Sequence, residues 1–144
     1  MTFAHPLIGL ILGKEFGYTA AFVVGSLFPD IDHLFVLIKN KHFKFREAFG
    51  AMKNEDAAGE RYKTPYTHSI LGWLIFSGAV FLYDQPTGLA FGAAYALHLL
   101  LDIIDTDEKQ LFYPFKKTIC GFLPVFSKYE IVFVIILVAI YFYI

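Results

Sequence analysis

A histidine and an aspartate four residues apart carry the strongest chemical signal in this sequence. His98 and Asp102 are separated by three leucines, and residues at this spacing lie on one face of an α-helix. Imidazole nitrogens and carboxylate oxygens are good ligands for zinc, manganese or iron. A hydrogen bond within a packed helix would also explain the pair. However, a carboxylate in an apolar segment is costly unless it is paired or binds a metal, so Asp102 favours a functional site.

A second group of such residues follows a proline. Pro29 suits the first position of a helix, and Asp30 and His33 then lie three residues apart on one face of it. Both are candidate metal ligands. Asp32 lies on another face of the helix and is a candidate for capping the helix or for a hydrogen bond to a metal-binding residue. Interaction with the helix dipole would explain the two aspartates without a metal, but it does not explain His33.

Three further histidines carry weaker signals. His68 stands just before a helix that we expect to begin near Ile70, and His5 lies close to the start of the chain. Each of them alone is more typical of a surface residue. His42 lies among lysines, and we interpret it as a solvated loop residue.

Apolar helices are the elements that must position these residues. The 144 residues are 57% apolar and 17% charged, against about 45–50% and about 25% in an ordinary soluble domain, which indicates contact with lipid. This length predicts one domain, residues 1–144. The net charge of -1 argues against nucleic-acid binding. The predicted apolar segments are residues 3–13, 16–28, 70–83, 88–104 and 131–144.

The charged residues predict how these segments sit in a membrane. Every Lys and Arg except Lys14 lies in one of two polar stretches, residues 39–63 and 105–130, and the positive-inside rule places both at the cytoplasmic face. We expect a re-entrant hairpin that turns at residues 13–15, because about 11 helical residues reach only about 16 Å. The segments are shorter than the roughly 20 residues that cross a bilayer, so the core of a soluble helical protein is the alternative.

This topology brings the candidate ligands to one membrane surface, although the histidines were not used to derive it. We therefore predict one shared His and Asp site. Three or four ligands with one open position bind a metal whose water has a pKa of about 7, which favours hydrolysis. A second metal, bridged by Asp30 or Asp102, would suit attack on a phosphoester. The predicted metal ligands are His5, Asp30, His33, His68, His98 and Asp102.

Short blocks along the chain match a known family pattern. The blocks are GSLFPDIDH at 25–33, THSI at 67–70, HLLLD at 98–102, LFYPF at 111–115 and HPLIG at 5–9. In this order they resemble the YdjM-like family of membrane-bound metal-dependent hydrolases, whose His and Asp pattern is similar to zinc-dependent phospholipase C. The resemblance implies hydrolytic activity and a phospholipase C-like metal site. It also implies that His5, Asp30, His68, His98 and Asp102 are ligands, with Asp32 and His33 near the metal.

The chain departs from that family pattern at two places. The family usually has His-Arg-Gly shortly before the Thr-His-Ser block, where this chain has Lys63-Thr64-Pro65. A ligand and an anion-binding Arg are therefore missing, and Lys63 is the candidate for contact with the substrate anion. In place of a Gly-containing turn after Asp102, residues 105–108 hold three acids. These acids could recruit further metal or mark a divergent or inactive member.

The sequence thus predicts an all-α, small membrane-embedded helical bundle with several passes through the inner membrane. A divalent metal, zinc with manganese or iron as alternatives, would serve hydrolysis of a phosphoester at a cytoplasm-facing site. Asp32 is the candidate general base or orienting residue. The expected partners are membrane lipid and a small phosphoester or lipid substrate, and the oligomeric state is left open. Two rivals remain: a non-catalytic integral membrane protein with a structural or transported metal, and a soluble helical phosphoesterase.

Overall fold

The regular structure of the described residues is helical. The structure is a computed structural model that describes residues 3–39, 41, 64–124 and 127–144, without the side chains of 36 and 37. Within these ranges the β features are two isolated bridges, which join Asp105 to Leu123 and Lys109 to Ile119. The helices are α1 (Ala4–Phe16), α2 (Thr19–Leu27), the 3₁₀-helix η1 (Phe28–Asp30), α3 (Ile31–Lys39), α6 (Ile70–Tyr83), α7 (Gln85–Ile104) and α8 (Lys128–Tyr143). The all-α prediction is confirmed for this part of the chain.

Helices α1 and α2 form a tight hairpin, but the turn lies later than predicted. Helix α1 continues to Phe16, and the chain reverses at Gly17 and Tyr18, whose φ angles are 75° and 53°. The predicted turn at residues 13–15 is wrong because Gly13 serves helix packing instead. A Cβ atom on Gly13 would lie 2.6 Å from Thr19 Cα, so the missing side chain lets the two helices meet.

Helices α6 and α7 form the predicted second hairpin, but α7 begins at Gln85, three residues before the predicted start at 88. A single residue, Asp84, separates them, and its carboxylate caps α7 by accepting a hydrogen bond from Thr87 N at 3.0 Å. The Trp73 indole donates to Gly92 O at 2.8 Å and ties the arms together. Helix α7 also packs against α2, so it lies at the centre of the bundle.

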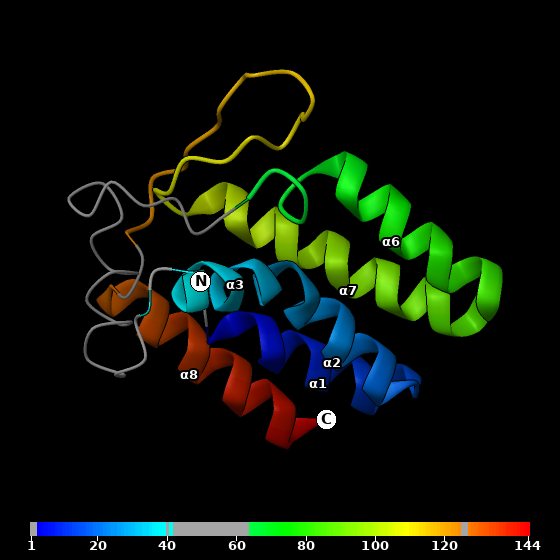
Figure 1. Cartoon of the computed structure of the whole chain (residues 1–144). Coiled ribbons are helices and arrows are strands. Elements are labelled where there is room, and N and C mark those ends of the chain that lie inside the picture. The colour runs from blue at the N-terminus through cyan, green and yellow to red at the C-terminus, as the bar shows by residue number, and fades with distance from the viewer. Residues whose placement is uncertain (1–2, 40, 42–63, 125–126) are drawn as a thin grey trace.

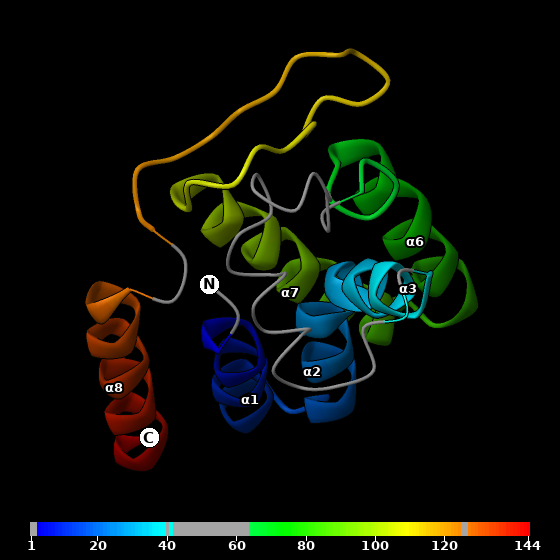
Figure 2. The ribbon, with the colours of Figure 1, turned by 60° about the vertical axis from the view of Figure 1, so that its left-hand side comes forward.

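Five helices run side by side in the order α6, α7, α2, α1, α8 (Figures 1 and 2). The start of α1, the loop before α6 and the loop 105–124 lie at one end of the bundle (Figure 1). We call it the site end. Both hairpin turns and the C-terminus lie at the other end, which we call the turn end; there Lys14 Nζ donates to Tyr141 O at 3.0 Å.

Helix α7 is the one helix in the described ranges that is long and apolar enough to cross a membrane, with 20 residues and a mean hydropathy of 1.6. Helices α1 and α2, with 13 and 9 residues, reach only about 20 and 14 Å. Many large apolar side chains on α6 and α8 are exposed, among them Ile75, Leu82 and Ile135. Exposed apolar surface of this extent is typical of contact with lipid or with another protein.

Candidate metal centre

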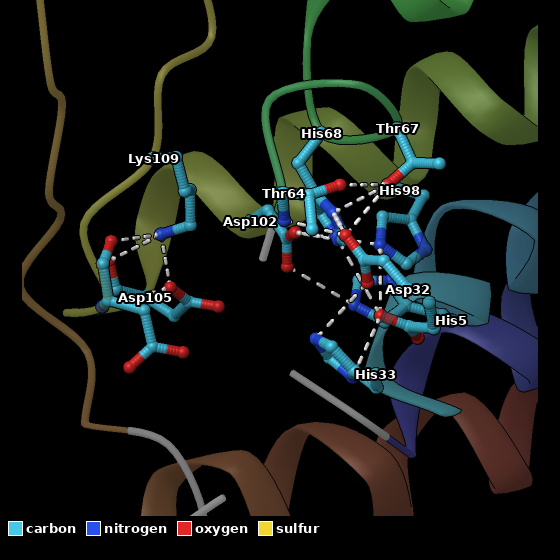
Figure 3. Close-up of polar contacts among 12 residues, drawn as sticks. His5, Asp32, His33, Thr64, Thr67, His68, His98, Asp102, Asp105 and Lys109 are labelled. Carbon is cyan, nitrogen blue, oxygen red and sulfur yellow. Dashed lines mark hydrogen bonds and ion pairs between the residues drawn. The ribbon is translucent and has the colours of Figure 1, made fainter. Parts of the chain in front are cut away.

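The six predicted metal ligands meet at the site end of the bundle (Figure 3). They come from segments far apart in the sequence: His5 from α1, Asp30 from η1, His33 from α3, His68 from the loop before α6, and His98 and Asp102 from α7. Four of them, His5, His68, His98 and Asp102, are at most 2% exposed. The side chains of Asp30 and His33 are 19% and 13% exposed, so the cluster is most accessible on their side.

Four donor atoms at the centre of the cluster form a ring in which each imidazole nitrogen lies close to two carboxylate oxygens. His68 Nε2 lies 3.6 Å from Asp30 Oδ1 and 3.4 Å from Asp102 Oδ2. His98 Nε2 lies 3.6 Å from Asp30 Oδ1 and 3.5 Å from Asp102 Oδ2. Ligand atoms at about 2.0–2.1 Å from a tetrahedral zinc lie roughly 3.3 Å from one another. Each of these four nitrogen–oxygen distances is therefore close to the distance between two ligands of one zinc ion.

His5 and His33 extend the cluster on either side. His5 Nε2 lies 3.4 Å from Asp102 Oδ1, and its ring stacks on that of His98 with 3.6 Å between centroids. His33 Nδ1 lies 3.5 Å from Asp30 Oδ1. Three overlapping sets can each surround an ion: His5, Asp30 and His98; Asp30, His33 and His68; His68, His98 and Asp102.

Asp32 holds His68 in position from outside these sets. Its Oδ2 accepts hydrogen bonds from Thr64 N at 2.6 Å and from Thr67 Oγ1 at 2.7 Å, and it lies 3.0 Å from His68 Nδ1. A proton on Nδ1 satisfies this contact, which leaves Nε2 as the metal-binding nitrogen. The geometry therefore suits the orienting role for Asp32 better than the role of general base.

A backbone carbonyl does the same for His98. His98 Nδ1 lies 2.7 Å from Ser26 O, so Nδ1 donates and Nε2 faces the cluster. Gly25 makes this contact possible, because a Cβ there would lie 2.3 Å from Phe91 O on α7. Among the described residues, neither His68 Nε2 nor His98 Nε2 has a hydrogen-bond partner, although both are buried. Two such nitrogens facing two carboxylates indicate a site that fits a cation.

The sequence of the chain matches one family model over nearly its full length. The model is that of the YdjM inner membrane protein family, and it matches residues 2–144. The chain belongs to this family. No curated protein and no solved structure was found to match the chain. For this member of the YdjM family, the match supports a protein of the inner membrane over a soluble one, while hydrolysis and similarity to phospholipase C stay predictions.

The electrostatics of this YdjM-family site favour ionised carboxylates. Burial lowers the pKa of the His68 imidazole, but contacts with Asp30 and Asp32 and the charge of Asp102 outweigh burial and raise this pKa to about 9. Burial raises the pKa of Asp30, but the surrounding histidines outweigh it and hold this pKa below its usual range. A metal would therefore meet charged carboxylates and would displace a proton from His68.

Other predicted features lie beside the cluster or outside the described residues. The acidic turn does not extend the metal site, because Asp105 is buried and paired with Lys109 Nζ, which also donates to Asp107 O at 2.7 Å (Figure 3). Lys63, the candidate for contact with the substrate anion, lies outside the described residues, as does His42.

Sequence reasoning missed the groups that orient the ligands. These are the Ser26 carbonyl, Thr64, Thr67 and Tyr95, whose hydroxyl donates to Thr67 O at 2.5 Å. Thr67 and Gly25 lie within the sequence blocks that resemble the family pattern. These blocks therefore pointed to some of the residues that orient the metal ligands.

Proposed function

We propose that this YdjM-family protein is a membrane-bound hydrolase that uses a divalent metal, zinc, to cleave a phosphoester. One observation carries the proposal. Two imidazole nitrogens and two carboxylate oxygens, all buried or nearly buried, make four nitrogen–oxygen contacts of 3.4–3.6 Å. This donor set and spacing are typical of zinc, with manganese or iron as alternatives. A phospholipase C-like arrangement is part of the proposal.

Each residue of the centre has a proposed task. Asp30, His68, His98 and Asp102 hold the metal, with His5 and His33 beside them. When bound, the metal supplies Lewis acidity towards a phosphoryl oxygen and makes a water more acidic. The water oxygen attacks phosphorus, the ester P–O bond breaks, and the leaving alkoxide takes up a proton. Asp32 keeps His68 in the metal-binding tautomer, and Lys63 is proposed to contact the substrate anion.

The exposed side of the cluster is the proposed entrance for substrate. Asp30 and His33 are its most accessible members, and the imidazole of His33 is proposed to accept a proton from the water or to give one to the leaving group. The more buried members would bind the metal and exclude water from the rest of the centre.

We also propose a multi-pass arrangement with the site at the cytoplasmic face and α1 and α2 as a re-entrant hairpin. The position of His5 in the cluster supports this, because the hairpin returns the chain to the site end. The shortness of α1 and α2 supports it as well.

A structural metal is the second candidate, and burial favours it. His5, His68, His98 and Asp102 are at most 2% exposed. A closed shell of four protein ligands is typical of structural zinc, whereas catalytic zinc keeps an open position.

Metal content and hydrolysis together test the proposal. We expect purified wild-type protein to retain zinc and the His98→Ala and Asp102→Ala variants to lose it by elemental analysis. Glu15→Ala, at the turn end, is the matched control and should retain zinc. Equal metal in all four proteins would end the metal proposal. Wild type should release alcohol from a phosphoester panel, lose this activity with a chelator and regain it with zinc. Retained zinc without hydrolysis of any phosphoester would favour the structural metal instead.

A further inference from the structure

An apolar groove of about 470 Å³ runs between α2, α6 and α7. Its walls include Ala20, Val24 and Phe28 on one side and Phe76, Ala79 and Phe91 on the other. Thr87 is the one lining residue with a polar side chain. A molecule bound in this groove would contact almost only methyl groups and aromatic rings. The lining therefore favours a hydrocarbon chain over a polar molecule.

The groove ends next to the metal centre. Phe28 forms its wall at that end, and Asp30 follows two residues later in η1, a rise of about 4 Å in a 3₁₀-helix. The Phe28 ring also packs on Tyr95 with 5.8 Å between centroids, and Tyr95 binds the carbonyl of Thr67, the residue before His68. The rings of Phe28 and Tyr95 thus lie between the groove and the cluster, and a polar group on a chain in the groove would reach past Phe28 to Asp30, the most exposed of the proposed ligands.

From Phe28 the groove leads towards the turn end of the bundle. Its lining extends along α2 to Ala20, eight residues away, which corresponds to about 12 Å of helix. On α7 it reaches Thr87, three residues after the turn residue Asp84. In an inner membrane protein with its site at the membrane surface, this direction leads into the hydrocarbon layer.

We propose that this groove holds an acyl chain of the substrate and that the substrate is a phosphate-bearing lipid whose phosphoryl group lies at the metal centre. The assignment rests on the proposed function and narrows its substrate class. Small side chains leave room for the acyl chain, because Ala20 on α2 and Ala79 on α6 are exposed and line the groove. A phenylalanine at either position would fill it without overpacking the core.

Photocrosslinking of a lipid tests the groove without any need for catalysis. The probe is phosphatidic acid with a diazirine at the end of one acyl chain, added to the full-length protein in lipid nanodiscs. We expect crosslinks in the α2 and α6 peptides of wild type and about a tenfold lower yield at these peptides in Ala79→Phe. Ile75→Phe is the matched control, because Ile75 is on the same helix, 58% exposed, and does not line the groove. Circular dichroism and zinc content should be unchanged in both variants.

Equal yields in all three proteins would overturn the proposal, since they would indicate general contact with bilayer lipid. Lipid crosslinks that are absent from the α2 and α6 peptides of wild type would overturn it too. For the head group, zinc-loaded wild type should prefer the phosphatidic acid probe over the matching diacylglycerol probe about tenfold, and His98→Ala should lose this preference. The same preference in both proteins would contradict the placement of the phosphate.

The two proposals fail in different ways. If the groove results hold and no phosphoester is cleaved, the lipid site stands and the hydrolase proposal falls. If a water-soluble phosphoester is cleaved while Ala79→Phe changes neither crosslinking nor cleavage of a long-chain lipid, the hydrolase proposal stands and the groove assignment falls.

Discussion

The two ends of the helical bundle use polar residues in opposite ways. At the turn end, Asp84 caps α7 and Lys14 binds a backbone carbonyl of α8, and both side chains are exposed. At the site end, buried histidines and aspartates from four helices and a loop face one another. The same helices form both ends, so the apolar scaffold is shared. This contrast indicates that the polar residues at the site end form a cluster that fits a cation, whereas those at the turn end bind exposed backbone groups.

Loss of a central carboxylate should give the largest contrast between the ends. Asp102 faces His5, His68 and His98 at 3.4–3.5 Å, and in Asp102→Asn one anionic ligand is lost from a buried site. We expect zinc affinity to fall more than about a hundredfold, beyond the roughly 10–100-fold typical of residues that only support a ligand. Competition with a chromogenic chelator measures this. Unchanged affinity would remove Asp102 from the centre.

Loss of the residue that orients His68 should have the next largest effect. Asp32→Asn keeps the size of the side chain but removes the charge that accepts from Thr64, Thr67 and His68. We expect zinc affinity to fall about 10–100-fold, with zinc still bound at high concentration. An affinity equal to that of wild type would mean that His68 does not depend on Asp32 for its orientation.

Zinc affinity at the site end should depend on pH. The pKa of His68 in the metal-free protein is raised from 6.5 to about 9, so zinc must displace a proton at neutral pH. Zinc affinity should rise from pH 7 towards pH 9 by up to about tenfold per pH unit. The same shift stabilises the metal-free fold fully below pH 6.5, and this contribution is lost as the pH rises through about 9. Chelator competition and chemical unfolding at several pH values measure both trends, and an affinity that falls with pH would contradict the account.

Loss of the cap at the turn end should have the smallest effect. Asp84→Ala removes the hydrogen bond to Thr87 N, which lowers the stability of the first turn of α7. We expect a small fall in melting temperature and an unchanged zinc affinity. A loss of zinc in this variant would show that the two ends are coupled, and it would contradict the claim that only the residues at the site end determine metal binding.

The sequence predicted those parts of the molecule that depend on local signals. The arms of the α6–α7 hairpin follow from the turn signal after Tyr83, and the two metal-ligand pairs of α7 and of η1 with α3 follow from helical spacing. The Ser26 carbonyl could not be predicted as a partner of His98, because that contact depends on how closely α2 approaches α7 at Gly25. The first turn was misplaced for a related reason: a glycine in a helix serves a turn or a close contact, and the sequence alone does not distinguish them.

X-ray absorption spectroscopy of the zinc-loaded protein in nanodiscs tests the central claim most directly. We expect about four nitrogen and oxygen ligands at about 2.0–2.1 Å from zinc, with outer-shell scattering from at least two imidazoles. This imidazole signal should weaken in His98→Ala. A zinc shell of oxygen atoms alone, without imidazole scattering, would contradict the claim that the histidines and aspartates at the site end form a metal centre.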